Sequence, residues 1–192
     1  MGKVKGCGMA QKKVIVVLAE GFEEIEAVTV IDVLRRSGIA VTAAGLSGLV
    51  VKGSRGIRVS ADKLLDQSGE DFDAIVLPGG SQGAINLSAS EKVNAIIKKF
   101  DTEGKLIAAI CAAPSVVLAP LGILKGRSVT GYPGMLEGFD KDTVYKEDSV
   151  VVDGNIITSR GPATALSFGL AIAEKLVGRD IADKVRKATL SF

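Results

Sequence analysis

Residues 106–122 read LIAAICAAPSVVLAPLG, and this stretch decides which fold the sequence predicts. Its first five residues are all apolar, as in a strand that is buried on both faces of a parallel sheet. A helical pattern begins about three residues after that strand ends. Pro114 suits the first turn of this helix, because its missing N–H would have no partner there anyway. Cys111 is therefore predicted to lie at a sharp turn between a strand and a helix.

Strands and helices alternate along most of the remaining chain. Such alternation is typical of a parallel, doubly wound sheet sandwiched by helices. We therefore predict a single α/β domain over residues 11–192, preceded by a Gly-rich, basic leader over residues 1–10 that we expect to be flexible. The expected strands cover residues 14–19, 40–46, 74–77 and 106–110, the helices 23–36, 90–100, 114–121, 163–177 and 181–187, a bent hairpin 50–59 and a β-rich stretch 128–158, with a loop between residue 80 and the helix at 90.

The composition excludes several classes of protein. Hydrophobic residues make up 47% of the chain and aromatic residues only 4%, so the core must consist of Val, Ile, Leu and Ala. The net charge of +2 is not gathered in blocks, which gives no support to a nucleic-acid partner. The apolar runs are far shorter than a membrane span, and no signal-peptide pattern precedes them. Two cysteines are too few for a disulfide scaffold, so we expect a reducing, cytoplasmic location.

Histidine is completely absent from the sequence. Its absence excludes a Cys-His or Ser-His catalytic pair within the chain and the usual zinc sites that contain histidine. Any chemistry must use Cys, Asp, Glu, Tyr, Ser or backbone groups. We therefore expect a site that works without a metal or other cofactor.

Cys111 is the first candidate catalytic residue. Its predicted position resembles a nucleophile elbow, at the carboxyl end of a strand where open α/β sheets form their sites. The positive end of the following helix and its unpaired N–H groups would lower the pKa of the thiol below about 8.5. The alternative is a small buried cysteine that only packs as a hydrophobic residue. The strand-end position and the small flanking residues favour a functional cysteine.

Three glutamates directly follow the first predicted strand. Favourable charge at a helix N-terminus explains Glu23 and Glu24. Glu26 differs, because Ile25, Ala27 and Val28 surround it and place it on or beside a buried face. A buried carboxyl tends to be protonated or to share a proton. Since the first strand of such a sheet lies centrally, Glu26 could share a proton with Cys111, although this sequence pattern leaves the pairing open.

Other candidate site residues also follow predicted strands. Gly79 and Gly80, in the motif LPGG at 77–80, could turn backbone N–H groups into the site as an oxyanion hole, or could simply form a tight turn. Tyr132 and Arg160 could line the same rim.

Taken together, these motifs resemble the DJ-1/ThiJ/PfpI superfamily, in the branch of the parkinsonism-associated protein deglycase. The segments that carry the resemblance are VLAEGFEEIEAV (17–28), DVLRRSGIAVT (32–42), SRG (54–56), VLPGG (76–80), LIAAICAAPSVVLA (106–119) and TSRGPATA (158–165).

The resemblance implies a flavodoxin-like fold and a homodimer. It places the reactive cysteine of the family at Cys111, its proton-sharing glutamate at Glu26, and its oxyanion donors at the N–H groups of Gly80 and Ala112. It further implies that Arg55 reaches the site from the partner subunit and that Arg160 lies at the rim. Where many relatives carry a histidine near the cysteine, this chain has Tyr132, which argues against peptidase activity.

Two functions are compatible with this resemblance. The first is cofactor-free conversion of small reactive aldehydes, methylglyoxal or glyoxal, to hydroxy acids, or removal of their early adducts from glycated proteins. The second is a redox-sensing stress protein or chaperone that acts through oxidation of Cys111 without turnover.

Overall fold

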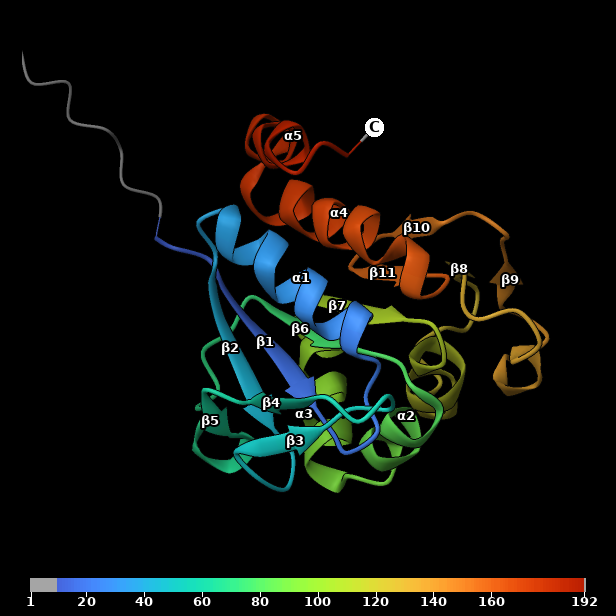
Figure 1. The fold of residues 1–192 in the computed structure, drawn as a ribbon. Coiled ribbons are helices and arrows are strands. Elements are labelled where there is room, and N and C mark those ends of the chain that lie inside the picture. Colours follow the sequence, from blue (N-terminus) through green and yellow to red (C-terminus); the bar gives the residue numbers. More distant parts are fainter. Residues whose placement is uncertain (1–9, 192) are drawn as a thin grey trace, which may run out of the picture.

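The computed structural model describes residues 10–191 and contains a central seven-stranded sheet with the strand order β10-β11-β7-β6-β1-β2-β5 (Figure 1). Every neighbouring pair in this sheet is parallel except β10 and β11. The predicted leader, residues 1–10, falls almost entirely outside the described residues. The strands of the sheet are β1 (Lys13–Leu18), β2 (Ala40–Gly45), β5 (Lys63–Leu64), β6 (Ala74–Leu77), β7 (Leu106–Ile110), β10 (Val150–Asp153) and β11 (Ile156–Ser159).

Helices cover both faces of the sheet (Figure 1). Helices α1 and α4 lie side by side on one face with α5 packed against α4, while α2 and α3 lie on the other face. This arrangement confirms the predicted mostly parallel, flavodoxin-like α/β fold with a single domain. The α-helices are α1 (Glu24–Arg36), α2 (Ser81–Ser88), α3 (Glu91–Thr102), α4 (Ala165–Val177) and α5 (Arg179–Ala188), and the smaller strands are β3 (Val50–Lys52), β4 (Arg58–Ser60), β8 (Ser128–Val129) and β9 (Val144–Tyr145). The helix predicted over residues 114–121 is a π-helical segment (Pro114–Leu118) followed by a 3-10 turn (Ala119–Leu121).

The topology brings the ends of three strands together. Strand β1 lies between β2 and β6, and β7 pairs with β6, so the carboxyl ends of β1, β6 and β7 meet at one edge of the sheet. The residues that follow these three strands include Glu26, Gly79 and Cys111. Strands β3 and β4 form the predicted hairpin beside this edge, with Val51 opposite Val59.

The structure differs from the prediction after β6, where we expected a loop and α2 is a helix. Its sequence SQGAINLS contains poor helix formers, so the helix depends on tertiary packing rather than on propensity. Gly83, Ala84 and Leu87 form its buried face. A Cβ atom at Gly83 would lie 2.7 Å from the Cα of Phe22, so this glycine lets α2 approach the turn after β1.

Within residues 10–191, no helix combines the length and the apolar composition that crossing a membrane requires.

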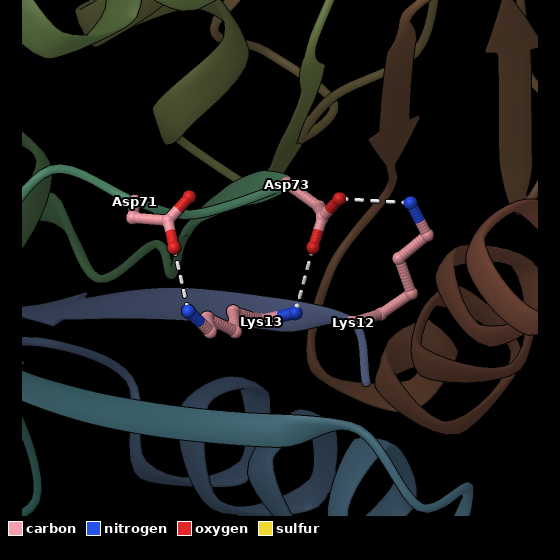
Figure 2. A network of polar contacts seen from close by, with 4 residues as sticks. All are labelled: Lys12, Lys13, Asp71 and Asp73. Carbon is pink, nitrogen blue, oxygen red and sulfur yellow. Dashed lines mark hydrogen bonds and ion pairs between the residues drawn. The ribbon is translucent and has the colours of Figure 1, made fainter. Parts of the chain in front are cut away.

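A network of polar contacts joins the start of β1 to the segment before β6 (Figure 2). Asp73 accepts hydrogen bonds from the backbone N–H of Lys13 and from the ammonium of Lys12, each at 2.8 Å. Asp71 pairs only with the ammonium of Lys13. Partial burial alone would raise the pKa of Asp73, but the bonds from Lys12 and Lys13 lower it below its ordinary value. Asp73 therefore stabilises the fold at neutral pH, and this contribution is lost as the pH falls below the ordinary carboxyl range.

Replacing Asp73 with alanine is expected to lower the free energy of unfolding by about 1–3 kcal/mol at pH 7, because a backbone N–H and an ammonium lose their acceptor. Asp71→Ala is the matched control, since the Asp71 side chain is 91% exposed and solvent screens its ion pair, so its loss should change stability less than the loss of Asp73. Denaturant unfolding of both variants measures the difference. Equal losses in the two variants would contradict this interpretation.

Candidate active site

Cys111 occupies a strained turn at the end of β7. Its φ is 64°, and the only other described non-glycine residue with positive φ is Leu190. The N–H of Cys111 donates to the carbonyl of Ser159 at 2.9 Å, and its carbonyl accepts from the N–H of Tyr132 at 2.8 Å. A strained residue of this kind persists only where the surrounding structure holds it in place, and such residues are concentrated at functional sites. The structure thus has the sharp turn predicted from the sequence, with the cysteine at its tip.

Glu26 lies directly beside this cysteine. It belongs to the first turn of α1, and its side chain is fully buried. Its Oε2 accepts a hydrogen bond from the N–H of Gly79 at 2.8 Å. Its Oε1 is buried without a conventional hydrogen-bond partner, and the carboxyl lies within hydrogen-bonding reach of the Cys111 thiol. The structure therefore brings together the two residues whose pairing the sequence left open.

The two groups shift each other's pKa. Burial raises the pKa of Glu26 to about 7, although the hydrogen bonds with Gly79 and Cys111 act in the opposite direction. Burial, the charge of Glu26 and the hydrogen bond to it raise the pKa of Cys111 to about 12, against the lowering effect of the N–H groups of Gly80 and Ala112. The predicted lowering of the thiol pKa is therefore wrong beside an ionised Glu26, because burial and the neighbouring charge outweigh the N–H donors.

Cys111 and Glu26 titrate as a pair. The first proton leaves near pH 7 and the second near pH 12, so between these values the pair holds one proton. This proton can sit on the sulfur or on the carboxyl oxygen. The sulfur is a thiolate nucleophile, and Glu26 an acid, when the proton lies on Glu26.

Backbone groups complete the surroundings of the sulfur. The N–H groups of Gly80 and Ala112 hydrogen-bond to Cys111, as the resemblance implied for an oxyanion pocket. Gly79 serves differently from the prediction, since its N–H is bound to Glu26 and is not free to act as an oxyanion donor. A Cβ atom at Gly79 would lie 2.6 Å from both the Cβ of Cys111 and Oε2 of Glu26. The absence of a side chain at this position is what lets the three residues approach one another.

Glu23 and Glu24 have a role that the sequence did not indicate. The Oε1 of Glu24 accepts from the N–H groups of Arg55 and Ile57, and the hydroxyl of Ser54 bonds to both glutamates. Burial would raise the pKa of Glu24, but these hydrogen bonds lower it. The two glutamates thus fasten the β3–β4 hairpin loop over the start of α1, in addition to placing charge at the helix end.

An open pocket of about 640 Å³ gives access to Cys111. Arg55 lines this pocket in its own chain, and its reach into the site of a partner subunit stays a prediction. Tyr132 also lines the pocket and is 47% exposed. The lining residues are Glu20, Gly21, Glu23, Lys52, Gly53, Ser54, Arg55, Gly80, Ser81, Gln82, Cys111, Ala112, Tyr132, Met135 and Pro162.

Arg160 is the predicted rim residue that is not part of this lining, whereas Glu26 and Gly79 lie buried behind Cys111. Its guanidinium donates to the carbonyl of Glu147 at 3.1 Å. Among residues 10–191, no group of three or more His, Cys, Asp or Glu side chains is arranged to hold a metal ion.

Comparison with known proteins places the chain in a family. The model of the DJ-1/PfpI family matches residues 12–175. Protein dj-1beta of Drosophila melanogaster is 46% identical over 182 residues, which cover 93% of this chain and 97% of that protein. The crystal structure of that Drosophila protein superimposes on this structure with a TM-score of 0.90. The superposition covers 94% of this chain and 98% of the Drosophila chain. The glutathione-independent glyoxalase DJR-1.2 of Caenorhabditis elegans is 39% identical over 183 residues, which cover 93% of this chain and 96% of that protein. The chain therefore belongs to the DJ-1/PfpI family.

Proposed function

We propose that this protein is a cysteine-dependent, cofactor-free glyoxalase and deglycase. Its substrates would be methylglyoxal or glyoxal and their early adducts on proteins. The observation that carries the proposal is the close approach of Cys111 and Glu26 around Gly79, with the cysteine lining an open pocket and the N–H groups of Gly80 and Ala112 facing its sulfur. The similarity to a relative named as a glutathione-independent glyoxalase supports the same reaction class.

The proposed reaction starts when the Cys111 thiolate adds to the aldehyde carbon of methylglyoxal and forms a hemithioacetal. The N–H groups of Gly80 and Ala112 stabilise the negative oxygen, and one well-placed donor of this kind contributes about 3–4 kcal/mol. Glu26 gives the shared proton to this oxygen and becomes a carboxylate. The carboxylate then takes the proton from the former aldehyde carbon and returns it to the adjacent carbon through an enediol, which leaves a thioester. Water hydrolyses the thioester to lactate and restores the thiol. The aldehyde carbon is oxidised to the carboxyl level while the neighbouring ketone carbon is reduced to an alcohol, so no external oxidant or reductant is consumed.

Turnover under reducing conditions tests the proposal. Purified protein, kept reduced with a phosphine, is incubated with methylglyoxal and lactate is followed, with Cys111→Ala as the blank. The proposal expects many lactate molecules per protein molecule from the wild type and only background from the variant. Background lactate from both proteins would overturn the glyoxalase proposal for this substrate class.

A redox-sensing role is the second candidate. It is favoured by the N–H groups of Gly80 and Ala112 beside the sulfur, at a residue that lines the open pocket. Hydrogen peroxide would oxidise the thiolate to a sulfinate, which these N–H donors and protonated Glu26 would hold, and the oxidised form would change partner or chaperone binding. Sulfinate formation on Cys111 at low peroxide, together with no lactate in the turnover assay, would favour this role.

The activity is expected to rise with pH through a midpoint near 7. Below that value both Cys111 and Glu26 are protonated, so neither a thiolate nor a base is present. The kcat/KM for methylglyoxal should therefore fall about tenfold for each pH unit well below the midpoint, with no descending limb before strongly alkaline pH. The measurement is kcat/KM of the wild type between pH 5 and pH 8. A flat profile over this range would contradict a proton shared by Cys111 and Glu26.

We also propose a homodimer in the cytoplasm. Ile25 and Val28 on α1 are 54% and 48% exposed, beside the β3–β4 hairpin, and a second copy that covered them would remove apolar surface from water. Light scattering after size exclusion is expected to give twice the chain mass, and a monomer at micromolar concentration would refute the dimer.

Fractionation of the native cells tests the proposed location. We expect the protein in the soluble cytoplasmic fraction.

A further inference from the structure

The strained backbone of Cys111 is held from both sides by other segments. The carbonyl of Ser159, at the end of β11, accepts the N–H of Cys111. The N–H of Tyr132, in the loop after β8, donates to the carbonyl of Cys111. A residue with positive φ returns to an ordinary conformation unless such contacts over-determine it. What fixes these two segments therefore also fixes the direction of the sulfur.

Side-chain hydroxyls fix the two segments. The Oγ1 of Thr158 accepts the N–H of Thr130 at 2.9 Å and so ties the segment that leads to Tyr132 onto β11. The hydroxyl of Ser159 donates to the carbonyl of Ser149 at 2.8 Å. Thr158 and Ser159 are fully buried, so these bonds are shielded from water.

Thr164 extends this network to the turn between β11 and α4. Its Oγ1 lies 2.7 Å from the hydroxyl of Ser159, and because each hydroxyl carries one proton, one of the two donates across this contact in place of its bond to a backbone carbonyl. The same oxygen accepts the N–H of Gly161 at 3.1 Å and donates to the carbonyl of Gly161 at 2.8 Å. The neighbouring Pro162 lines the pocket. The three hydroxyls therefore connect the end of β11, the pocket wall and the loop that carries Tyr132.

We infer that Thr158, Ser159 and Thr164 are positioning residues, whose hydroxyls hold Cys111 in its strained conformation and thereby set the reactivity of its thiol. None of the three is a residue through which the reaction itself is proposed to pass. Loss of one hydroxyl would let Ser159 or Tyr132 shift, and the sulfur would leave the N–H groups of Gly80 and Ala112. The inference rests on the proposed function only where lactate is the readout.

The test measures Cys111 itself. The wild type, Thr164→Val and Thr158→Val are treated with iodoacetamide between pH 5 and pH 9, and peptide-resolved mass spectrometry follows the alkylation of Cys111 separately from that of Cys7. Valine keeps the shape of threonine but removes the hydroxyl. We expect alkylation at pH 7.5 to slow about tenfold in both variants, with a displaced pH midpoint, because the sulfur loses its alignment.

Two controls separate positioning from stability. Thr164→Ser keeps the hydroxyl and is expected to alkylate within about twofold of the wild type. Thr189→Val removes hydrogen bonds to the carbonyls of Val185 and Arg186 at the end of α5, so it should lower stability without slowing alkylation. Wild-type alkylation in both valine variants, or equal slowing in Thr189→Val, would overturn the inference.

Lactate formation by the same proteins keeps this inference distinct from the proposed function. Slower alkylation in the valine variants with no lactate from any protein supports the positioning role and refutes the glyoxalase. Lactate from the wild type with unchanged alkylation in the valine variants supports the glyoxalase and refutes the positioning role.

Discussion

Replacing Glu26 with glutamine is expected to lower lactate formation from methylglyoxal by about 10²- to 10⁴-fold, the usual contribution of a positioned acid or base. Glutamine has the shape of glutamate and its oxygen can still accept the N–H of Gly79, so the fold should persist. The glutamine amide neither takes up nor releases a proton near neutral pH, so it cannot move the proton between the two carbons. The hemithioacetal should therefore not become a thioester. Steady-state kinetics measures the effect, and turnover within tenfold of the wild type would contradict the role of Glu26.

Stability against pH provides the control for that variant. The folded-state pKa of Glu26, about 7, lies above its ordinary value of 4.5, so its contribution is fully present below pH 4.5 and is lost as the pH rises through 7. Glutamine does not ionise and escapes this loss. The free energy of unfolding of Glu26→Gln relative to the wild type should therefore improve by about 3 kcal/mol between pH 4.5 and pH 8. If this difference in free energy of unfolding stayed constant with pH, the pKa of the Glu26 carboxyl would not be raised in the folded protein.

Gly79→Ala is expected to lower activity about 100-fold and to destabilise the protein. The added Cβ would lie 2.6 Å from atoms of Cys111 and Glu26 and 2.9 Å from the carbonyl oxygen of Ile110, so at least one of them must move. Overpacking of this kind costs about 1–3 kcal/mol, and a displaced catalytic group can lose about 100-fold in rate.

Gly48→Ala is the control for Gly79→Ala. Its φ is not in the left-handed region, and the nearest atom to its added Cβ would be the carbonyl oxygen of Val50 at 3.7 Å, which is an ordinary contact. Unfolding curves and kcat/KM for the two variants are compared with the wild type. If Gly79→Ala behaved as Gly48→Ala does, the close approach at Gly79 would have no functional meaning.

The features of the fold that depend on local pattern could be predicted from the sequence. The all-apolar strand before Cys111 and the proline three residues after it specify the sharp turn. The alternation of strands and helices specifies the parallel sheet. The same pattern did not reveal α2, because SQGAINLS carries a weak helical signal and its helix depends on packing against Phe22.

The contacts within the site could be predicted only in part. Parallel strands end at the same edge, which made the meeting of Glu26 and Cys111 possible, but strand order is set by the whole fold. The direction in which the pKa of the Cys111 thiol shifts depends on how closely Glu26 approaches and on how deeply Cys111 and Glu26 are buried. No single segment of the sequence carries that information. The hydrogen bonds of Glu24 to the hairpin loop join residues about thirty positions apart, and Arg160 turns toward Glu147, so neither could be predicted from local sequence.

Native mass spectrometry of the intact protein mixed with methylglyoxal tests most directly whether Cys111 adds to the aldehyde and Glu26 moves the proton. The wild type, Glu26→Gln and Cys111→Ala are compared, and the last of these gives the background from Cys7 and from lysines. The proposed mechanism predicts that Glu26→Gln accumulates a reversible adduct of one methylglyoxal above that background and forms almost no lactate, while the wild type forms lactate with little adduct. Lactate from Glu26→Gln at the wild-type rate, or an adduct no greater than in Cys111→Ala, would contradict it.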